Sequence, residues 1–491
     1  MSGSTASGRN LRFVIIGAGM AGILAAIKLR EADYDDIVIY EKADRIGGTW
    51  RDNTYPGLTC DVPSHSYTYS FPPNPEWSQY LPPGEEVFGY FAGIADRYKV
   101  GDLVRFNQEV TSCVFADGRW NLETKSGTSD SADFVIAATV VLHHPSYPDI
   151  RGIDEFTGAM FHSSRWDHEI PLDGQRVGLI GNGSTGVQIV SALAERASKL
   201  SQFQRTAQWI MKVENGFYTE EQKAAFRSDP ELLRRMQCDE TYMANVKRFT
   251  DAISDANSPE IAQIEAFVLD NLEQSVRDPE LKEKLRPTYR AACKRLIYSP
   301  DYYEKIQHPD VELVTEGIER IEANGVRTKD GRLHEVDVLV LATGFRADQF
   351  MRPMHIVGRG GVKLNDIWAK RPCAYLAVSM PDFPNLFMVN GPTGPVGNFS
   401  LIDIAERQVA YITQLIDQIR QGRCREISVT QEAMDVYEVK RIAAAKGTIF
   451  GSGCNSWYLD AEGVPASWPW SYDAFAQAMT EPDLAAYAQV G

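Results

Sequence analysis

Two stretches of the chain share one pattern of apolar and polar positions: a short apolar run, a glycine-rich turn, and a helix with one apolar face. The glycines follow the spacing G-x-G-x-x-G and are Gly17, Gly19 and Gly22 after the run that begins at Phe13, and Gly181, Gly183 and Gly186 after the run that begins at Val177. A continuous apolar run is typical of a strand buried on both faces of a parallel sheet. The pattern therefore predicts an α/β fold with two Rossmann-like dinucleotide-binding domains.

The glycine spacing points to phosphate binding. The first glycine permits a tight turn, the second lets a pyrophosphate approach the backbone, and the third lets helix and strand pack closely. The N-terminus of the following helix offers free N–H groups and a partial positive charge. We expect Ser184 and Thr185, inside the second turn, to contact the cofactor as well. A single such motif also occurs in ordinary α/β units, but two in the same context indicate two nucleotide sites.

The residues that follow the second strand of each unit distinguish the two sites. Glu41 lies 24 residues after Gly17, where a carboxylate binds the ribose hydroxyls of FAD or NAD. Arg205 lies 24 residues after Gly181 and is followed by Thr206. An arginine at this point can pair with the 2′-phosphate of NADPH, although a surface arginine is the alternative. The sequence thus predicts FAD or NAD at the first site and NADPH at the second.

Two later apolar runs, 133–139 and 337–343, are expected to complete the two sheets, so that the chain crosses between domains near 140–150 and again near 344. The predicted division assigns 1–148 and 344–491 to an FAD-binding domain and 149–217 and 286–343 to an NADPH-binding domain.

A helical insertion is predicted over 218–285, because no glycine occurs from Phe217 to Glu316. Its apolar residues at helical spacing are Ile261, Ile264, Phe267, Val268 and Leu272. We expect this segment to form a wall or lid of the substrate cleft. A further helix is predicted over 401–420.

Composition narrows the classes of function. The 491 residues are 44% hydrophobic and 24% charged, which excludes a disordered chain or a fibre. The net charge of −16 argues against nucleic acid and anionic membranes as partners. Seven cysteines in a chain of this length do not make a disulfide framework, so a reducing, cytoplasmic location fits best. Residues 1–10 are small and polar and are predicted to form a flexible tail. The scattered histidines, with a hinge or surface role expected for His143 and His144, predict no metal site.

A string between the two glycine turns carries a resemblance to a known family. It has the form F-x-G-x-x-x-H-x-x-x-W-[PD], and its residues are Phe156, Gly158, His162, Trp166 and Asp167. Taken alone, His162 would be interpreted as a structural histidine. In this position the string resembles the fingerprint of the type I Baeyer–Villiger monooxygenases, a family of class B flavoprotein monooxygenases.

Further stretches resemble the same family. They are Gly47-Gly48-Thr49-Trp50 beside the flavin, Cys60-Asp61-Val62 with Tyr67 near it, Lys294-Arg295 before Asp301, the second hinge at Gly344-Phe345, and Cys454-Asn-Ser-Trp457-Tyr458 in a C-terminal loop. The chain departs from the family in Val140 of the first hinge, in Arg346, and in Asp167, where proline is commoner. None of these departures removes a catalytic group.

The resemblance implies an NADPH- and O2-dependent enzyme that holds FAD and inserts one oxygen atom next to a ketone carbonyl through a C4a-peroxyflavin, giving an ester or lactone. It gives Arg295 the role of stabilising negative charge and Asp61 the role of orienting that arginine. Lys294 would assist the 2′-phosphate, and Trp457 would contact the nicotinamide cofactor. The alternative for Lys294 and Arg295 is a basic pair at the surface, and the alternative for Trp457 is a tryptophan buried in the core. His162 would couple the linker to movement of the cofactor.

Three other functions compete with this interpretation. A heteroatom oxygenase acting on amines or sulfides shares both glycine motifs. A flavoprotein disulfide reductase would need a redox cysteine pair, and the first domain offers only Cys60 and Cys113. A nucleotide-binding redox sensor would not turn over substrate. The sequence leaves open which ketone is used and whether the protein is a monomer or a homodimer.

Overall fold

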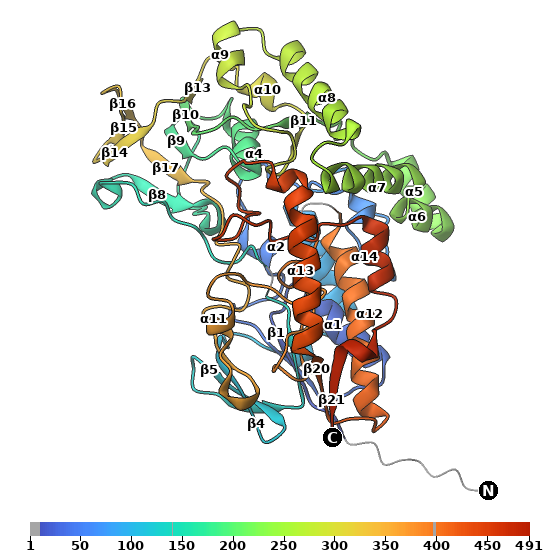
Figure 1. Cartoon of the computed structure of the whole chain (residues 1–491). Coiled ribbons are helices and arrows are strands. Elements are labelled where there is room, and N and C mark those ends of the chain that lie inside the picture. Colours follow the sequence, from blue (N-terminus) through green and yellow to red (C-terminus); the bar gives the residue numbers. More distant parts are fainter. Residues whose placement is uncertain (1–9, 140, 396–398) are drawn as a thin grey trace, which may run out of the picture.

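The computed structural model describes residues 10–139, 141–395 and 399–491. The predicted flexible tail, apart from Asn10, and Val140 of the first hinge lie outside the described residues. Figure 1 shows two lobes. The lower lobe combines the N-terminal part of the chain, in blue, with the C-terminal part, in orange and red. The upper lobe is built from the central part of the chain, in green and yellow.

The lower lobe contains a five-stranded parallel sheet in the order β19-β7-β1-β2-β3. Its strands are β1 (Phe13–Ile16), β2 (Ile37–Tyr40), β3 (Val104–Arg105), β7 (Phe134–Ala137) and β19 (Leu386–Met388). Every residue of β1, β2 and β7 is buried, as the continuous apolar runs predict for a sheet covered on both faces. Strand β19 comes from the C-terminal part of the chain, so distant segments build one sheet.

The upper lobe contains a second five-stranded sheet, in the order β13-β10-β9-β17-β8, and it is also parallel. Its strands are β8 (Ala159–His162), β9 (Arg176–Ile180), β10 (Lys199–Phe203), β13 (Val311–Val314) and β17 (Val338–Leu341). The predicted run 337–343 forms the strand β17, which lies between β9 and β8. Both glycine turns therefore follow the central strand of a parallel sheet, where nucleotides bind in such folds.

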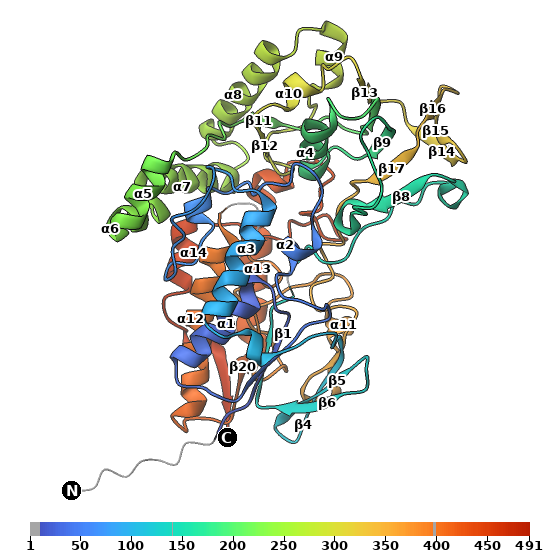
Figure 2. The same cartoon turned by 180° about the vertical axis from the view of Figure 1, so that it is seen from behind.

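Helices cover the sheets (Figures 1 and 2). In the lower lobe α1 packs against α12, which spans 401–420 as the sequence predicts. The helices outside the central segment are α1 (Met20–Glu31), α2 (Thr49–Asp52), α3 (Gly84–Arg97), α4 (Ser184–Leu193), α10 (Tyr302–Lys305), α11 (Leu364–Ile367), α12 (Leu401–Arg420), α13 (Gln431–Gly447) and α14 (Tyr472–Ala478). The face of α12 that carries Ile402, Ala405, Val409, Ile412 and Ile416 is buried.

Residues 218–285 form five helices at the outer side of the upper lobe (Figure 2). They are α5 (Glu220–Ser228), α6 (Pro230–Gln237), α7 (Glu240–Ser254), α8 (Pro259–Ser275) and α9 (Pro279–Lys284). Three of them begin with proline at the first position, each after a capping side chain: Asp229, Ser258 or Asp278. Proline fits there because its missing N–H would have no helical partner, and the cap satisfies a neighbouring N–H.

One apolar residue of α8 lies away from the buried face of the helix. Ile261, Val268 and Leu272 are buried, but Phe267 is 59% exposed. Residues 261, 268 and 272 are separated by seven and four positions and share one face, whereas 267 lies about 100° from 268 around the helix axis. The apolar face of α8 is therefore narrower than the list of apolar residues suggests.

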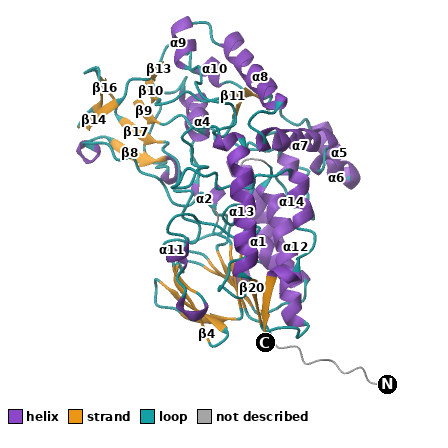
Figure 3. Ribbon diagram, viewed as in Figure 1, coloured by secondary structure: helices purple, strands orange, loops and turns teal. Residues whose placement is uncertain are grey.

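Smaller sheets complete the fold (Figure 3). Their strands are β4 (Val110–Ala116), β5 (Arg119–Thr124), β6 (Ser129–Ala132), β11 (Ile210–Lys212), β12 (Ile297–Ser299), β14 (Ile318–Glu322), β15 (Gly325–Thr328), β16 (Leu333–Glu335), β18 (His355–Val357), β20 (Glu426–Val429) and β21 (Tyr487–Val490). Within the described ranges, no helix combines the length and the apolar character that crossing a membrane requires.

Candidate functional site

A cavity of about 630 Å³ is lined by both glycine turns and by several loops between them. Its volume lies in the range of ligand sites in proteins. The predicted residues that line it are Gly17, Gly19, Glu41, Gly48, Thr49, Trp50, Asp61, Tyr67, Gly183, Ser184, Thr185, Arg295 and Trp457. The predicted cofactor residues outside this lining are Gly22, Gly181, Gly186, Arg205, Thr206 and Lys294. One cavity thus collects residues from positions 16 to 457 of the chain.

The three glycines of the first turn differ in what a side chain at each position would meet. Gly17 has a φ of +103°, and a Cβ there would lie 2.8 Å from the carbonyl oxygen of Ala138. A Cβ at Gly22 would lie 1.9 Å from the carbonyl oxygen of Gly17, so this glycine lets α1 pack against the turn. A Cβ at Gly19 would meet only Gly48, at 3.4 Å. Gly19 is therefore the position of the three that sterics leave open toward a phosphate.

The second turn repeats this division. Gly181 has a φ of +122°, and its Cβ would lie 2.2 Å from the carbonyl oxygen of Ala342. A Cβ at Gly186 would lie 2.4 Å from the carbonyl oxygen of Gly181. A Cβ at Gly183 would meet no protein atom within 4 Å. Gly183 thus borders open space at the N-terminus of α4, which fits the approach of a phosphate group.

Glu41 is held rigidly at the end of β2. Its Oε2 accepts a hydrogen bond from the backbone N–H of Ala18 at 2.8 Å, and its Oε1 accepts one from Ala43 at 2.9 Å. It also forms an ion pair with buried Arg51, whose Nη1 lies 3.1 Å from Oε1. Burial opposes the charge of Arg51, but Asp52 and Glu41 outweigh it and raise the pKa of this guanidinium. Sequence reasoning missed Arg51, and its only signal was its place beside Gly48-Thr49-Trp50.

Trp50 and Tyr67 meet at the cavity wall. The indole N–H of Trp50 donates to the hydroxyl of Tyr67 at 3.2 Å, and the rings pack edge to face at 5.6 Å. Burial raises the pKa of Tyr67, so the phenol stays neutral. The pair therefore offers a rigid, uncharged surface of the kind on which a flavin ring can pack.

Arg295 and Asp61 are in direct contact in the wall of the cavity. Asp61 lies in the loop after α2, and Arg295 lies directly before β12. Arg295 donates from Nε and Nη2 to the same Asp61 oxygen, Oδ2, at 2.9 and 2.5 Å. Burial lowers the pKa of Arg295, but Asp61 outweighs that effect and raises it, so the guanidinium stays charged at any working pH. The pairing expected from the family resemblance is present, and its catalytic role stays a prediction.

Lys294 and Arg205 lie near each other beside the second turn. Burial lowers the pKa of Lys294, and the positive charge of Arg205 lowers it further. The Lys294 ammonium lies 4.6 Å from the centre of the Tyr289 ring. Asn182, inside the glycine turn, donates to Gln204 at 2.9 Å and to the carbonyl oxygen of Thr206 at 2.7 Å. Two neighbouring cations suit a phosphate dianion, and Asn182, which sequence reasoning missed, holds the turn that carries Arg205.

His162 connects the fingerprint to the second hinge. Its Nδ1 lies 2.9 Å from the Ser164 hydroxyl, and its Nε2 lies 3.1 Å from the carbonyl oxygen of Gly344. Its ring also packs against Phe345. Burial lowers the pKa of His162, which favours the neutral imidazole. These contacts place His162 where the chain passes between the two sheets.

The other fingerprint residues shape the linker around His162. A Cβ at Gly158 would lie 2.4 Å from the carbonyl oxygen of Asp337 and 2.7 Å from the Phe156 ring. Trp166 packs edge to face on Phe161 at 5.0 Å. Asp167 accepts a hydrogen bond from the backbone N–H of Glu169.

Trp457 is 44% exposed and lines the cavity, which argues against a core tryptophan.

His143 and His144 also line the cavity, and their Nε2 atoms form hydrogen bonds with the carbonyl oxygens of Phe350 and Arg352, respectively. The loop 391–397 follows an apolar strand and is dense in glycine and proline, from which the sequence predicts a place near the flavin; residues 396 and 397 lie outside the described residues. Among the described residues, no three metal-ligating side chains are grouped.

The cysteines divide into one disulfide and five free thiols. Cys293 and Cys454, 161 positions apart, form the disulfide, which sequence reasoning did not predict. Cys60 and Cys113 are free and buried. Burial raises the pKa of both thiols, that of Cys113 to about 12. A reactive redox pair needs lowered thiol pKa values, so these two cysteines do not support disulfide reductase chemistry.

Comparisons with known proteins agree with this geometry. Residues 14–218 match the family model described as pyridine nucleotide-disulphide oxidoreductase. An uncharacterized monooxygenase of Mycobacterium tuberculosis is 45% identical over 95% of this chain and 93% of its own length. A Baeyer–Villiger monooxygenase of Streptomyces coelicolor is 35% identical over 98% and 94% of the two lengths.

Solved structures extend the likeness to the whole fold. A crystal structure of cyclohexanone monooxygenase from Rhodococcus sp. Phi1 bound to NADP+ matches with a TM-score of 0.87 and 30% identity, and it covers 99% of this chain and 100% of that chain. A crystal structure of the OTEMO complex with FAD and NADP matches with a TM-score of 0.87 and 27% identity at the same coverage. The two parallel sheets, the shared cavity and the full-length relatives agree, and the chain belongs to the Baeyer–Villiger monooxygenases.

Proposed function

We propose that the protein uses FAD, NADPH and O2 to insert one oxygen atom next to the carbonyl of a small-molecule ketone, producing an ester or lactone. The observation that carries this proposal is the charged Arg295, held by Asp61 in a cavity that both glycine turns line. Bound FAD would supply the activation of O2 and NADPH the reducing electrons. The family membership and the relatives bound to FAD and NADP support both cofactors.

The residues present fit these cofactors. The helix N-terminus of α1 with Gly19, and Glu41 at the end of β2, suit the pyrophosphate and ribose of FAD. The rigid pair of Trp50 and Tyr67, with Gly48 and Thr49, suits the flavin. The open backbone at Gly183 and the cations Arg205 and Lys294 suit NADPH with its 2′-phosphate.

Arg295 has the charge that this reaction requires. An oxygen that attacks a ketone carbonyl leaves negative charge on the carbonyl oxygen, and a fixed guanidinium stabilises that charge without giving up a proton. Asp61 orients the guanidinium and takes no proton in this scheme. Trp457 would cover the nicotinamide side of the cavity, and His162 would link the position of the hinge at Gly344 to that of the upper lobe.

The domain division remains part of the proposal. The first sheet, with β19 from the C-terminal part, supports an FAD-binding domain of 1–148 and 344–491. The second sheet supports an NADPH-binding domain of 149–217 and 286–343, with the helices of 218–285 as a wall of the substrate cleft. We propose a cytoplasmic location because five of the seven cysteines are free thiols, and because the Cys293–Cys454 disulfide is buried away from reductants in solution. Light scattering would decide between monomer and homodimer.

One rapid-mixing experiment tests the function. The purified protein with bound FAD is reduced by NADPH without oxygen and mixed with aerated buffer that contains a ketone, a sulfide or an amine. Products are identified by mass spectrometry. An ester or lactone formed from ketones supports the proposal. Oxygenation of sulfides or amines alone would indicate a heteroatom oxygenase, and hydrogen peroxide as the only product would indicate an oxidase.

A further inference from the structure

The C-terminal segment that carries Trp457 is attached to the upper lobe on one side. Cys454 lies three residues before Trp457 and forms a disulfide with Cys293. Both cysteines are buried in one apolar cluster. The cluster includes Ile449, Phe450 and Tyr458 from the C-terminal segment, and Trp209, Ile261, Val268 and Leu296 from the central part of the chain. Residues 449–458 therefore pack on the upper lobe.

The chain then turns back in a small hairpin of residues 459–465. Leu459 and Pro465 form a β-bridge, and the backbone N–H of Asp460 donates to the carbonyl oxygen of Val464 at 2.9 Å. Oδ1 of Asp460 accepts from the backbone N–H groups of Glu462 and Val464, both at 2.9 Å. One oxygen of the Asp460 carboxylate is thus used to fix the turn of the hairpin.

The other oxygen of Asp460 attaches the hairpin to the lower lobe. Oδ2 forms an ion pair with Arg371, which also donates from Nη2 to Glu462 at 3.1 Å. Arg371 belongs to the segment between α11 and β19. The side chain of Asp460 is 1% exposed and that of Arg371 is 15% exposed, so solvent screens this pair little. Removing the arginine would leave a buried carboxylate without its counter-charge.

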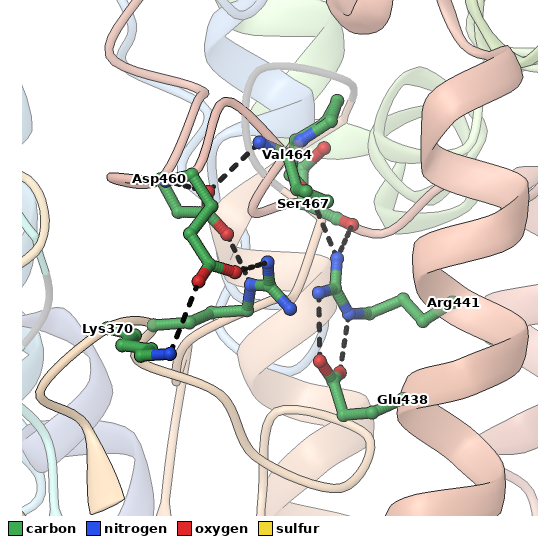
Figure 4. A network of polar contacts seen from close by, with 9 residues as sticks. Lys370, Glu438, Arg441, Asp460, Val464 and Ser467 are labelled. Atoms are coloured by element: carbon green, nitrogen blue, oxygen red, sulfur yellow. Dashed lines mark hydrogen bonds and ion pairs between the residues drawn. The ribbon is translucent and has the colours of Figure 1, made fainter.

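Buried Arg441 of α13 provides a second attachment to the lower lobe (Figure 4). Its Nη1 donates to the carbonyl oxygens of Pro465, at 2.8 Å, and Ser467, at 3.5 Å. Its Nη2 donates to Glu438 at 2.9 Å, which fixes the direction of the guanidinium. Arg371 at the turn and Arg441 on the outgoing side therefore hold residues 459–467 on the lower lobe.

Trp457 lies between the two sets of attachments. Cys454 precedes it by three residues, and Asp460 follows it by three residues. Its ring stacks on Tyr458 at 4.2 Å between ring centres, and Tyr458 packs on Phe450 at 4.5 Å. The half-exposed indole lines the cavity. Its place in the cavity wall therefore depends on one attachment to each lobe.

We propose that Arg371 is a positioning residue: its ion pair with Asp460 holds the hairpin on the lower lobe and so keeps Trp457 in the cavity wall, where the indole contacts the nicotinamide cofactor. This inference rests on the proposed function and deepens it, because it explains how a cofactor contact is placed. Arg371 lies outside the lining of the cavity, so it acts on the cofactor through the hairpin.

Hydrogen–deuterium exchange in the enzyme with bound FAD tests the attachment. Arg371→Ala should speed exchange of residues 455–467 at least tenfold, because Asp460 loses its counter-charge, while exchange in α12 stays unchanged. Arg371→Lys keeps a positive charge for Asp460 and should restore most of the protection. Lys370→Ala is the matched control and should exchange like the wild type. The side chain of Lys370 is 82% exposed and lies 3.7 Å from Glu462, and such surface pairs contribute little.

Titration with NADP+ tests the consequence for the cofactor. Arg371→Ala should raise the Kd for NADP+ about tenfold, and Lys370→Ala should leave it unchanged. In the Trp457→Ala background, Arg371→Ala should have no further effect, because the side chain that it positions is gone. A merely structural role for Arg371 would weaken binding equally in both backgrounds.

The proposal is overturned if Arg371→Ala leaves the exchange of residues 455–467 or the Kd for NADP+ unchanged. It is also overturned if the effect on the Kd is the same with and without Trp457. Neither readout requires an oxygenated product, so a failure to form esters would count against the proposed function alone.

Discussion

Arg295 and Asp61, which lie 234 positions apart, meet through two hydrogen bonds to one carboxylate oxygen, Asp61 Oδ2. This arrangement leaves Asp61 Oδ1 outside the pair and fixes the plane of the guanidinium along one edge. The arginine side chain lines the cavity and is 32% exposed, enough for a reacting group to reach it. The pair therefore combines a fixed orientation with an accessible charge.

Removing the guanidinium should slow oxygenation strongly without emptying the flavin site. We expect Arg295→Ala to lower the rate of ester formation by about 10²–10³-fold, the usual effect of losing a group that stabilises an oxyanion. NADPH consumption should continue with release of hydrogen peroxide. The ratio of ester to NADPH consumed measures this effect, and Arg277→Ala on the surface serves as the control. Ester formation near the wild-type rate would contradict the assigned role.

The choice of nicotinamide cofactor should depend on Arg205. A hydrogen bond to a charged group contributes about 1.5–3 kcal/mol, so Arg205→Ala should raise the KM for NADPH by roughly 10- to 100-fold. The KM for NADH, which has no 2′-phosphate, should hardly change. Arg196→Ala is the matched control, because Arg196 lies at the surface and forms an ion pair with Asp173. An unchanged preference for NADPH over NADH would refute the phosphate assignment.

Local patterns were sufficient for much of the fold. The apolar runs before Gly17 and Gly181 predicted buried strands, because a parallel sheet covered on both faces needs no alternation. The helix over 401–420 was predicted from its apolar face and is present as α12. Phe267 follows the same helical spacing but is 59% exposed, because α8 buries only a narrow face and spacing alone does not give the width of that face.

Contacts between distant segments were harder to predict. The Arg295–Asp61 pair came from the family resemblance, since no local pattern relates positions so far apart. The Cys293–Cys454 disulfide could not be predicted, because the positions of the seven cysteines along the sequence do not indicate which of them pair. Arg51 and Asn182 act through contacts with other residues of the site, and the glycine motifs beside them do not predict those contacts. Their importance follows only from the three-dimensional arrangement.

The glycines of the second turn should respond differently to a methyl group. A Cβ at Gly181 would collide with the carbonyl oxygen of Ala342, whereas a Cβ at Gly183 meets no protein atom within 4 Å. We expect Gly181→Ala to lower the melting temperature. Gly183→Ala should keep the wild-type melting temperature but weaken NADP+ binding at least tenfold, because the methyl group occupies space expected for the phosphate.

Gly89→Ala is the control for this pair. Gly89 lies inside α3 with no neighbour within 4 Å of its would-be Cβ, and alanine favours a helix. It should bind NADP+ normally and be as stable as the wild type or more so. Calorimetry of unfolding and NADP+ titration separate the two effects. If Gly183→Ala bound NADP+ as tightly as the wild type, the phosphate would have to lie elsewhere.

Finally, His65 should make the fold sensitive to acid. It is 2% exposed, packs against Tyr218 and Phe226 of the central helical segment, and neither ring nitrogen has a hydrogen-bond partner among the described residues. Burial lowers its pKa from 6.5 to about 4. The unfolded chain therefore binds a proton between pH 6.5 and 4 that the folded chain does not, so stability falls as the pH falls through this window.

The contribution of His65 follows from about 1.4 kcal/mol per pKa unit and amounts to roughly 3 kcal/mol lost between pH 7 and pH 4. His65→Phe keeps an aromatic ring among Tyr218 and Phe226 but cannot take up a proton. Its free energy of unfolding, measured in urea, should therefore decline less between pH 7 and pH 4 than that of the wild type. His355→Gln, at an exposed position, should follow the wild type. Parallel curves for wild type and His65→Phe would show that His65 is not the group that titrates.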